Sequence, residues 1–188
     1  MQLTKIIIFF LSLICCSCNA QKIDSVIKSE SFPKSWVGYY EGELMIFGVD
    51  SIKQVVTMGL NIRSISDSTY TWTISYLLDK KDERKYELQV IDKQKGIYQI
   101  DEKNGILLEA NFFNEHLISR FGVNKSLLDI SYSKIGNQIH FMVISGNRDG
   151  VLKEIEEDSI PEIFGYQVFS FQKAILQKKT LSNLNPTR

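Results

Sequence analysis

Residue types that perform catalysis or bind metal ions are sparse in this sequence. The 188 residues contain two histidines, His116 and His140, and three cysteines, Cys15, Cys16 and Cys18, all near the N-terminus. Two separated histidines do not supply a His-rich zinc site, and neither stands in an H-E-x-x-H motif. There is no G-x-S-x-G, P-loop or dinucleotide-binding motif either. We therefore expect a protein that is not an enzyme and that uses no metal and no cofactor.

Aromatic side chains offer a different chemistry, the binding of a small ligand. Aromatic residues make up 11% of the chain, and Trp and Tyr combine a large apolar surface with a polar tip, which suits the wall of a pocket. An arginine at the pocket mouth would meet an anionic head group. The candidate ligand-binding residues are Trp36, Tyr40, Trp72, Tyr76, Tyr86, Arg84 and Arg120. The alternative is that the same aromatic residues form a filled core.

Other polar groups receive structural interpretations. The run Asp101-Glu102-Lys103-Asn104-Gly105 lacks the ligand spacing of an EF-hand and is interpreted as a charged hairpin turn. His140 is expected to be a core or interface histidine, and His116 an exposed residue beside a turn. The acidic run at 154–158 is interpreted as a solvated surface.

Strict alternation of apolar and polar residues predicts the elements that would position a ligand-binding site. In Thr69-Tyr70-Thr71-Trp72-Thr73-Ile74-Ser75-Tyr76 every second residue is large and apolar, so a strand aligns them on one face. Similar segments follow at short intervals, separated by turn signals such as Asn104-Gly105. Two glycines on the apolar face of the first strand, Gly38 and Gly42, predict a bend or the close approach of another backbone. The fold class is all-β: a single antiparallel meander β-barrel of about 8–10 strands.

The start of this pattern resembles a known family. Ser35-Trp36-Val37-Gly38-Tyr39-Tyr40-Glu41-Gly42 is similar to the first strand of lipocalin-like (calycin) barrels, in which a Trp near a Gly begins the barrel. The resemblance implies a meander barrel with an internal ligand site. The disulfide and the long C-terminal helix of lipocalins are missing. The chain also looks like uncharacterised bacterial exported proteins with a similar opening, and that likeness implies no activity.

The N-terminal residues follow the order of segments found in a secretory signal peptide. A short start with Lys5 precedes an apolar run at 6–14, which is shorter than the roughly 20 residues of a transmembrane helix. The stretch Leu13-Ile14-Cys15-Cys16-Ser17-Cys18-Asn19 resembles the cleavage region of bacterial lipoproteins, with Cys18 as the preferred lipidation site and Cys16 as the alternative. Ordinary cleavage after Ala20 is the competing interpretation. We expect a signal peptide at 1–17 (or 1–20), a flexible tether at 18–33, a β-barrel domain at 34–178 and a disordered tail at 179–188.

These features suggest two functions. Lys+Arg and Asp+Glu number 22 each, so the formal net charge is zero and does not indicate a nucleic-acid-binding protein. The leading hypothesis is an envelope lipoprotein, anchored to a bacterial membrane, that binds a small hydrophobic or amphiphilic ligand inside the barrel; a soluble periplasmic or secreted protein is the alternative location. The rival is a filled barrel whose outer aromatics Tyr39 and Phe47 dock a partner protein or a cell-wall component. A cavity above about 300 Å³ would favour the carrier.

Overall fold

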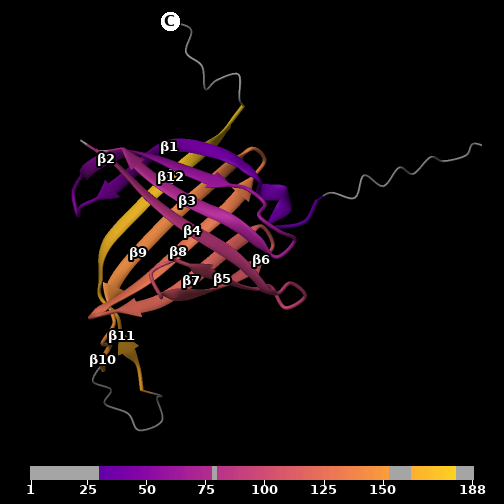
Figure 1. Cartoon of the computed structure of the whole chain (residues 1–188). Helices are drawn as coiled ribbons and strands as arrows, with labels where there is room; N and C mark the ends of the chain where they lie inside the picture. Colours follow the sequence, from indigo (N-terminus) through magenta and orange to yellow (C-terminus); the bar gives the residue numbers. More distant parts are fainter. Residues whose placement is uncertain (1–29, 78–79, 153–161, 181–188) are drawn as a thin grey trace, which may run out of the picture.

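The protein is a closed antiparallel β-barrel in a computed structural model that describes residues 30–77, 80–152 and 162–180 (Figure 1). Ten strands follow one another around the barrel in the order β1-β12-β9-β8-β7-β6-β5-β4-β3-β2. They are β1 (Gly38–Phe47), β2 (Ile52–Ile62), β3 (Thr69–Leu77), β4 (Lys81–Asp92), β5 (Ile97–Asp101), β6 (Leu107–Phe113), β7 (His116–Val123), β8 (Ser126–Ile135), β9 (Gln138–Asn147) and β12 (Val168–Lys179). The all-β, antiparallel meander prediction is confirmed.

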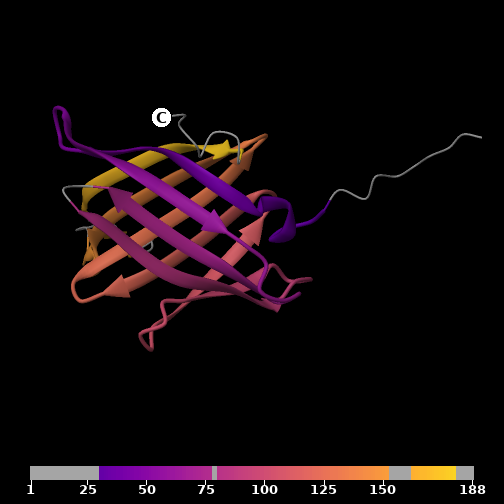
Figure 2. The same cartoon turned by 45° about the horizontal axis from the view of Figure 1, so that its top comes forward.

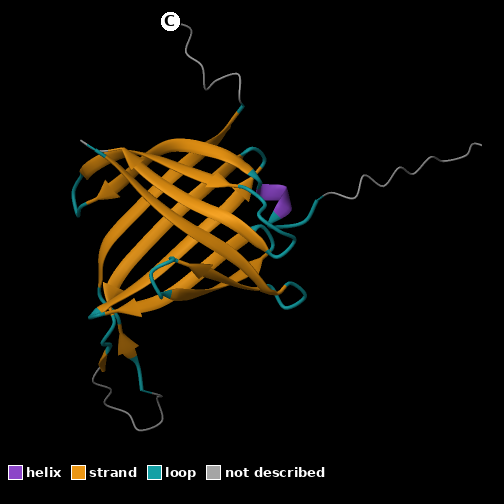
Figure 3. Ribbon diagram, in the orientation of Figure 1, coloured by secondary structure: helices purple, strands orange, loops and turns teal. Residues whose placement is uncertain are grey.

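A short ribbon interrupts the meander between β9 and β12. The strands β10 (Val151–Leu152) and β11 (Phe164–Gly165) pair only with each other. In Figures 1 and 3 this ribbon projects beyond the barrel wall, at the end remote from the single helical turn. The acidic run predicted at 154–158 lies outside the described residues.

Alternation along each strand fills the barrel interior. In β3 the inward residues Tyr70, Trp72 and Ile74 are buried, whereas the threonines between them are partly exposed. Tight turns set the register between strands. Asn114 and Glu115, at the predicted β6–β7 reversal, both have positive φ, at 42° and 65°, the backbone twist that a two-residue hairpin turn requires.

One end of the barrel is plugged by the segment that precedes β1. A 3₁₀ turn, η1 (Lys34–Trp36), lies at this end of the barrel (Figure 2). The Trp36 side chain is fully buried in the core. Phe32 stacks on Phe112 at 4.1 Å between ring centroids and meets Trp36 edge to face at 4.8 Å. The indole Nε1 of Trp36 donates a hydrogen bond of 3.0 Å to Glu115 Oε2. The plug therefore joins residues that are far apart in the sequence.

The prediction that Trp36 begins the first strand is wrong. Pro33 precedes the turn, and the amide of Trp36 donates to the Pro33 carbonyl at 3.0 Å, so the chain coils once before it extends. Packing against Phe32 and Glu115, rather than strand pairing, holds Trp36 in place.

The boundaries of the folded region differ in detail from the predicted domain. Phe32 and Pro33, at the end of the predicted tether, are buried in the plug, and Lys179, in the predicted tail, is the last residue of β12. The cysteines and the proposed signal segment lie outside the described residues. Within the described ranges, no helix is long and apolar enough to cross a membrane.

Candidate functional site

A cavity of about 230 Å³ occupies the half of the barrel farther from η1. Strand β3 begins beside the plugged end, so the series Trp72, Ile74, Tyr76 leads away from it along the cavity wall. The lining residues come from eight strands or their ends and are Trp72, Ile74, Tyr76, Arg84, Tyr86, Ile100, Glu102, Leu108, Ser119, Phe121, Leu128, Ile130, Tyr132, Phe141, Val143 and Gln172.

One small inward residue, Ser119, lines this half of the barrel. Ser119 on β7 is the buried polar residue of the described core, at 5% exposure, and its hydroxyl donates to the Glu109 carbonyl at 2.6 Å. In the plugged half, by contrast, the rings of Phe32 and Trp36 take up the interior space. The barrel is thus filled at one end and open inside at the other.

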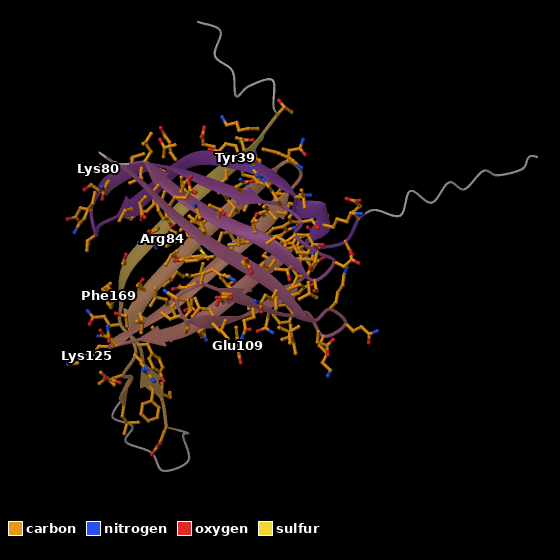
Figure 4. The ribbon with its side chains drawn as sticks, viewed as in Figure 1. Tyr39, Lys80, Arg84, Glu109, Lys125 and Phe169 are labelled. Carbon is orange, nitrogen blue, oxygen red and sulfur yellow. The ribbon has the colours of Figure 1, made fainter. Side chains whose placement is uncertain are left out.

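Arg84 is held at the cavity by three neighbours. Its Nε donates to Asp82 Oδ2 at 3.3 Å, and its guanidinium carbon lies 5.1 Å from the centroid of the Tyr76 ring. Burial disfavours the charge, but the phenols of Tyr76 and Tyr86 and the carboxylate of Asp82 outweigh it, so the pKa of Arg84 is raised. Figure 4 shows Arg84 in the half of the barrel nearer the β3–β4 connection, where Lys80 is labelled. The side chain is therefore a fixed cation at the open half.

A carboxylate lines the same cavity. Asp101 pairs with Glu87 in the β4–β5 ladder, so the next residue, Glu102, emerges beside Tyr86. The pKa of Tyr86 is raised first by burial and next by the Glu102 charge, while Arg84 acts in the opposite direction. Asn104 in the adjoining turn donates to Glu102 Oε2 at 3.2 Å. The Tyr86 phenol thus feels one positive and one negative group.

The deeper wall is aromatic and carries an unpaired donor. Trp72 and Tyr132 meet edge to face, with 5.1 Å between ring centroids. Burial strongly raises the pKa of the Tyr132 phenol. The buried Trp72 Nε1 has no partner in hydrogen-bonding geometry among the described residues. The site is consequently apolar at depth and polar towards its mouth.

The structure divides the predicted ligand-binding residues into two groups. Trp72, Tyr76, Tyr86 and Arg84 line the cavity together. Tyr40 and Trp36 are fully buried but belong to the filled half: the Tyr40 hydroxyl donates to the Trp36 carbonyl at 3.0 Å.

The placement of Arg120 at the barrel mouth is wrong. Arg120 shares the outer face of β7 with exposed Ile118, while Leu117 and Ser119 point inward. Its side chain is 69% exposed and pairs with Asp129 on β8. It therefore cannot contact a ligand inside the barrel.

The two histidines also lie outside the cavity. His140 was expected in the core or at an interface, and the core position is wrong, because Ile139 and Phe141 take the inward positions. His140 lies half-buried on the outer face of β9, with its Nε2 3.2 Å from Gln138 Oε1. His116 is exposed, as expected, and its Nδ1 lies 2.8 Å from the Asn114 carbonyl. Among the described residues there is no group of three or more His, Cys, Asp or Glu residues that could hold a metal ion.

Several residues that line the cavity are not among the ligand-binding residues predicted from the sequence. The sequence predicts Glu102 in a hairpin turn, and it does not distinguish Ser119, Tyr132 and Gln172 from other strand residues. One feature of the sequence does indicate Tyr132: it follows Ile130 by two residues, and in a strand this spacing puts both side chains on the same, inward face. The meeting of residues from strands so far apart in sequence follows only from barrel closure.

The two outer aromatic residues proposed for docking, Tyr39 and Phe47, already contact neighbouring side chains of this protein. The Tyr39 hydroxyl donates to Glu41 Oε2 at 2.6 Å, and burial together with Glu41 raises the pKa of Tyr39 to about 12. Phe47 lies against Phe171, with 5.3 Å between ring centroids. A group of exposed apolar residues lies on and beside the projecting ribbon: Val151, Leu152, Ile163, Phe164, Tyr166, Val168 and Phe169.

Fold and cavity together define a ten-stranded antiparallel barrel, plugged at one end, with a small amphipathic cavity in the other half. The chain is similar in fold to a protein of unknown function from the DUF3598 family of Nostoc punctiforme PCC 73102, with a TM-score of 0.52 and 11% identity. The match covers 76% of this chain and 47% of that one, so the chain spans about half the length of this neighbour. No family model and no curated protein matches the sequence. At this identity, the likeness concerns the fold alone.

Proposed function

We propose that this protein is a non-enzymatic, lipocalin-like envelope lipoprotein that binds one small amphiphilic molecule in the open half of its barrel. The observation that carries the proposal is the amphipathic cavity of about 230 Å³, with aromatic side chains at depth and Arg84 near the mouth. Ligand sites in proteins typically combine such apolar walls with a few fixed polar groups.

The size of the cavity sets the size of the ligand. At about 230 Å³ the cavity lies below the roughly 300 Å³ that was expected of a carrier from the sequence, so that criterion is not met and the proposal is restricted to a molecule smaller than drug-sized ligands. An apolar cavity of about 150 Å³ holds benzene, and a water molecule occupies roughly 30 Å³ in the liquid. The cavity therefore accommodates one ring and two or three further non-hydrogen atoms, and a long lipid chain does not fit.

The distribution of polarity sets the orientation of the ligand. Leu128, Ile130 and Val143 offer apolar contact, whereas Arg84 and the Tyr86 hydroxyl lie towards the mouth. Burying an apolar group contributes about 25 cal/mol per Å² removed from water, so the apolar part of the ligand is expected inside and its polar end beside Arg84.

The membrane anchor in this proposal rests on the N-terminal sequence, in which Cys18 follows an apolar run and the small residue Ser17. An acylated cysteine with several chains would hold the protein stably on a bilayer. Metabolic labelling with a radioactive fatty acid tests it: label lost in Cys18→Ala and kept in Cys16→Ala is expected. Label retained in the Cys18 variant contradicts the assignment.

Native mass spectrometry of the full-length protein, purified from an envelope extract, tests the ligand. We expect an additional mass of one small molecule that disappears on denaturation. Val143 lines the cavity and is 8% exposed, so Val143→Phe should abolish that mass. The matched control Val55→Phe, on the outer face of β2 at 50% exposure, should keep it. A bare mass in repeated preparations, or equal masses in both variants, refutes the proposal.

A second candidate is a docking role for the β10–β11 ribbon. Val151, Phe164 and Phe169 on and beside it are 65%, 49% and 56% exposed, and clustered exposed apolar side chains are typical of interaction sites. Chemical crosslinking in whole cells tests this candidate. A crosslinked partner protein or cell-wall fragment that is lost in Phe164→Ser supports it, and identical crosslinks in that variant refute it.

A further inference from the structure

The cavity presents charges of both signs, and this restricts the chemistry of the ligand. Arg84 on β4 and Glu102 at the end of β5 both line it. Both groups act on Tyr86: the Glu102 carboxylate raises the pKa of its phenol, and the Arg84 guanidinium lowers it. The two groups therefore stand on neighbouring strands, around one phenol, at one cavity.

The three charged groups near the mouth do not favour a simple anion. Asp82 already engages the Nε edge of Arg84 at 3.3 Å. Together with Glu102, it leaves one cation against two carboxylates. A ligand with only a negative charge would gain from Arg84 but be repelled by both acids. A ligand with only a positive charge would gain from the acids but be repelled by Arg84, and Asp82 is already paired with Arg84. Only a ligand that carries both charges interacts favourably with Arg84 and with Glu102.

We infer that the ligand is a small zwitterion of the α-amino-acid type with an apolar side chain: its carboxylate pairs with Arg84, its ammonium group pairs with Glu102, and its side chain enters the cavity. This assignment rests on the proposed function, because it names the ligand class of the same site.

The positions of the two charged residues suit such a ligand. An α-amino acid carries its two charges on atoms attached to one carbon, and the cavity presents Arg84 two residues before Tyr86 on β4 and Glu102 opposite Tyr86 at the end of β5. One ring fits the apolar part of the cavity, between residues such as Leu128 and Ile130, by the volume argument given above. The charged head group then remains at the mouth, beside Tyr86.

Isothermal titration calorimetry of the full-length protein with four matched probes tests the inference. The probes are L-phenylalanine, 3-phenylpropionate, 2-phenylethylamine and 2-phenylethanol, which share a ring and differ in charge. We expect L-phenylalanine to bind at least tenfold more tightly than each of the other three.

Variants assign each charge to its residue. Arg84→Gln should weaken L-phenylalanine and 3-phenylpropionate at least fivefold and leave 2-phenylethanol unchanged. Glu102→Gln should weaken L-phenylalanine and 2-phenylethylamine to a similar extent, again without affecting the alcohol. Arg120→Gln, an exposed control on the outer face, should alter none of the four affinities. Thermal melting of each variant verifies that it is folded.

The probes separate failure of the inference from failure of the proposed function. If the four probes bind with equal affinity, or if the charged-residue variants leave their ranking unchanged, the cavity binds small molecules but the zwitterion assignment is overturned. Tighter binding of 3-phenylpropionate than of L-phenylalanine overturns it in favour of a simple anion. If none of the four binds, the zwitterion assignment is overturned, and the proposed function is refuted with it where native mass spectrometry also gives a bare mass.

Discussion

Gly42 on the first strand faces the backbone of the last strand at close range, and replacing it with alanine is a direct test of barrel closure. Leu44 on β1 pairs with Ala174 on β12, and Glu41 pairs with Gln177. A Cβ added at Gly42 would stand 2.2 Å from the Ile175 carbonyl oxygen and 3.3 Å from the Leu176 Cα. Both are backbone atoms, so no rotamer change can relieve the contact.

The size of the effect follows from two opposing contributions. Forcing an additional methyl group into a packed site costs about 1–3 kcal/mol, and a 2.2 Å contact with backbone places Gly42→Ala in the upper part of that range. Replacing Gly by Ala stabilises by about 0.4–1 kcal/mol through the unfolded chain. The expected net loss is about 1–2 kcal/mol, which corresponds to a lower Tm by roughly 2–8 °C at this chain length.

Urea unfolding followed by circular dichroism measures this loss against a matched control. At Gly48, in the β1–β2 turn, an added Cβ would meet only the side chain of Lys53, with Cε at 2.3 Å. That side chain is flexible and can move away, so Gly48→Ala should change the free energy of unfolding by less than about 0.5 kcal/mol. Equal free energies of unfolding for the two variants would refute the tight approach of β12 to Gly42.

The remaining predictions concern the plug, a buried phenol and the cavity. Glu115→Ala removes the acceptor of the Trp36 indole N–H and should cost about 1–3 kcal/mol in urea unfolding, whereas Glu115→Gln keeps an acceptor and should cost less; equal losses would contradict the role of this hydrogen bond. Burial raises the pKa of Tyr40 to about 12, so its contribution to stability is complete below pH 10, the unfolded pKa, and is lost as the pH rises towards 12. The urea midpoint, measured between pH 8 and pH 11.5, should fall less steeply with pH in Tyr40→Phe than in the unaltered protein. Parallel curves for the two proteins would mean that the Tyr40 phenol is not the source of the pH dependence. Val143→Phe should fill the cavity and raise the free energy of unfolding by about 0.5–2 kcal/mol; a strongly destabilised variant would mean that the cavity is smaller than described.

The strands could be predicted because in several segments apolar and polar residues alternate with almost no exceptions. In β3 every inward position is large and apolar, and every outward one except the last, Leu77, carries a small hydroxyl group, so alternation alone assigns the faces. The same logic predicted the backbone approach at Gly42, since a glycine on an apolar face has no side chain to pack.

Where both faces of a strand are mixed, alternation gives no answer. In β7, apolar Ile118 lies outward beside Arg120, while the polar Ser119 points inward and is buried. Burial of Ser119 depends on its hydrogen bond to the Glu109 carbonyl on β6, a contact that the local sequence does not contain. The orientation of Arg120 was therefore beyond sequence reasoning.

The division into a filled and a hollow half depends on contacts around the whole barrel. Phe32 precedes the first strand, yet it packs against Tyr98 and Phe112 from the middle of the chain. Only the assembled ring of strands shows that such side chains fill one end and that residues such as Glu102 reach the other. A local pattern cannot carry that information.

The pairing of the first strand with the last also has a kinetic consequence. Tyr39 pairs with Lys179, so the ladder that closes the barrel joins residues separated by nearly the entire folded chain. Contacts of such high sequence separation slow folding, because the entropy of closing a long loop is lost before the contacts form. A chain emerging from a ribosome or a translocation pore exposes the unpaired edges of β1 and β9 until β12 is released. Until then these edges can pair with other chains, and assistance by a chaperone is most valuable during this interval.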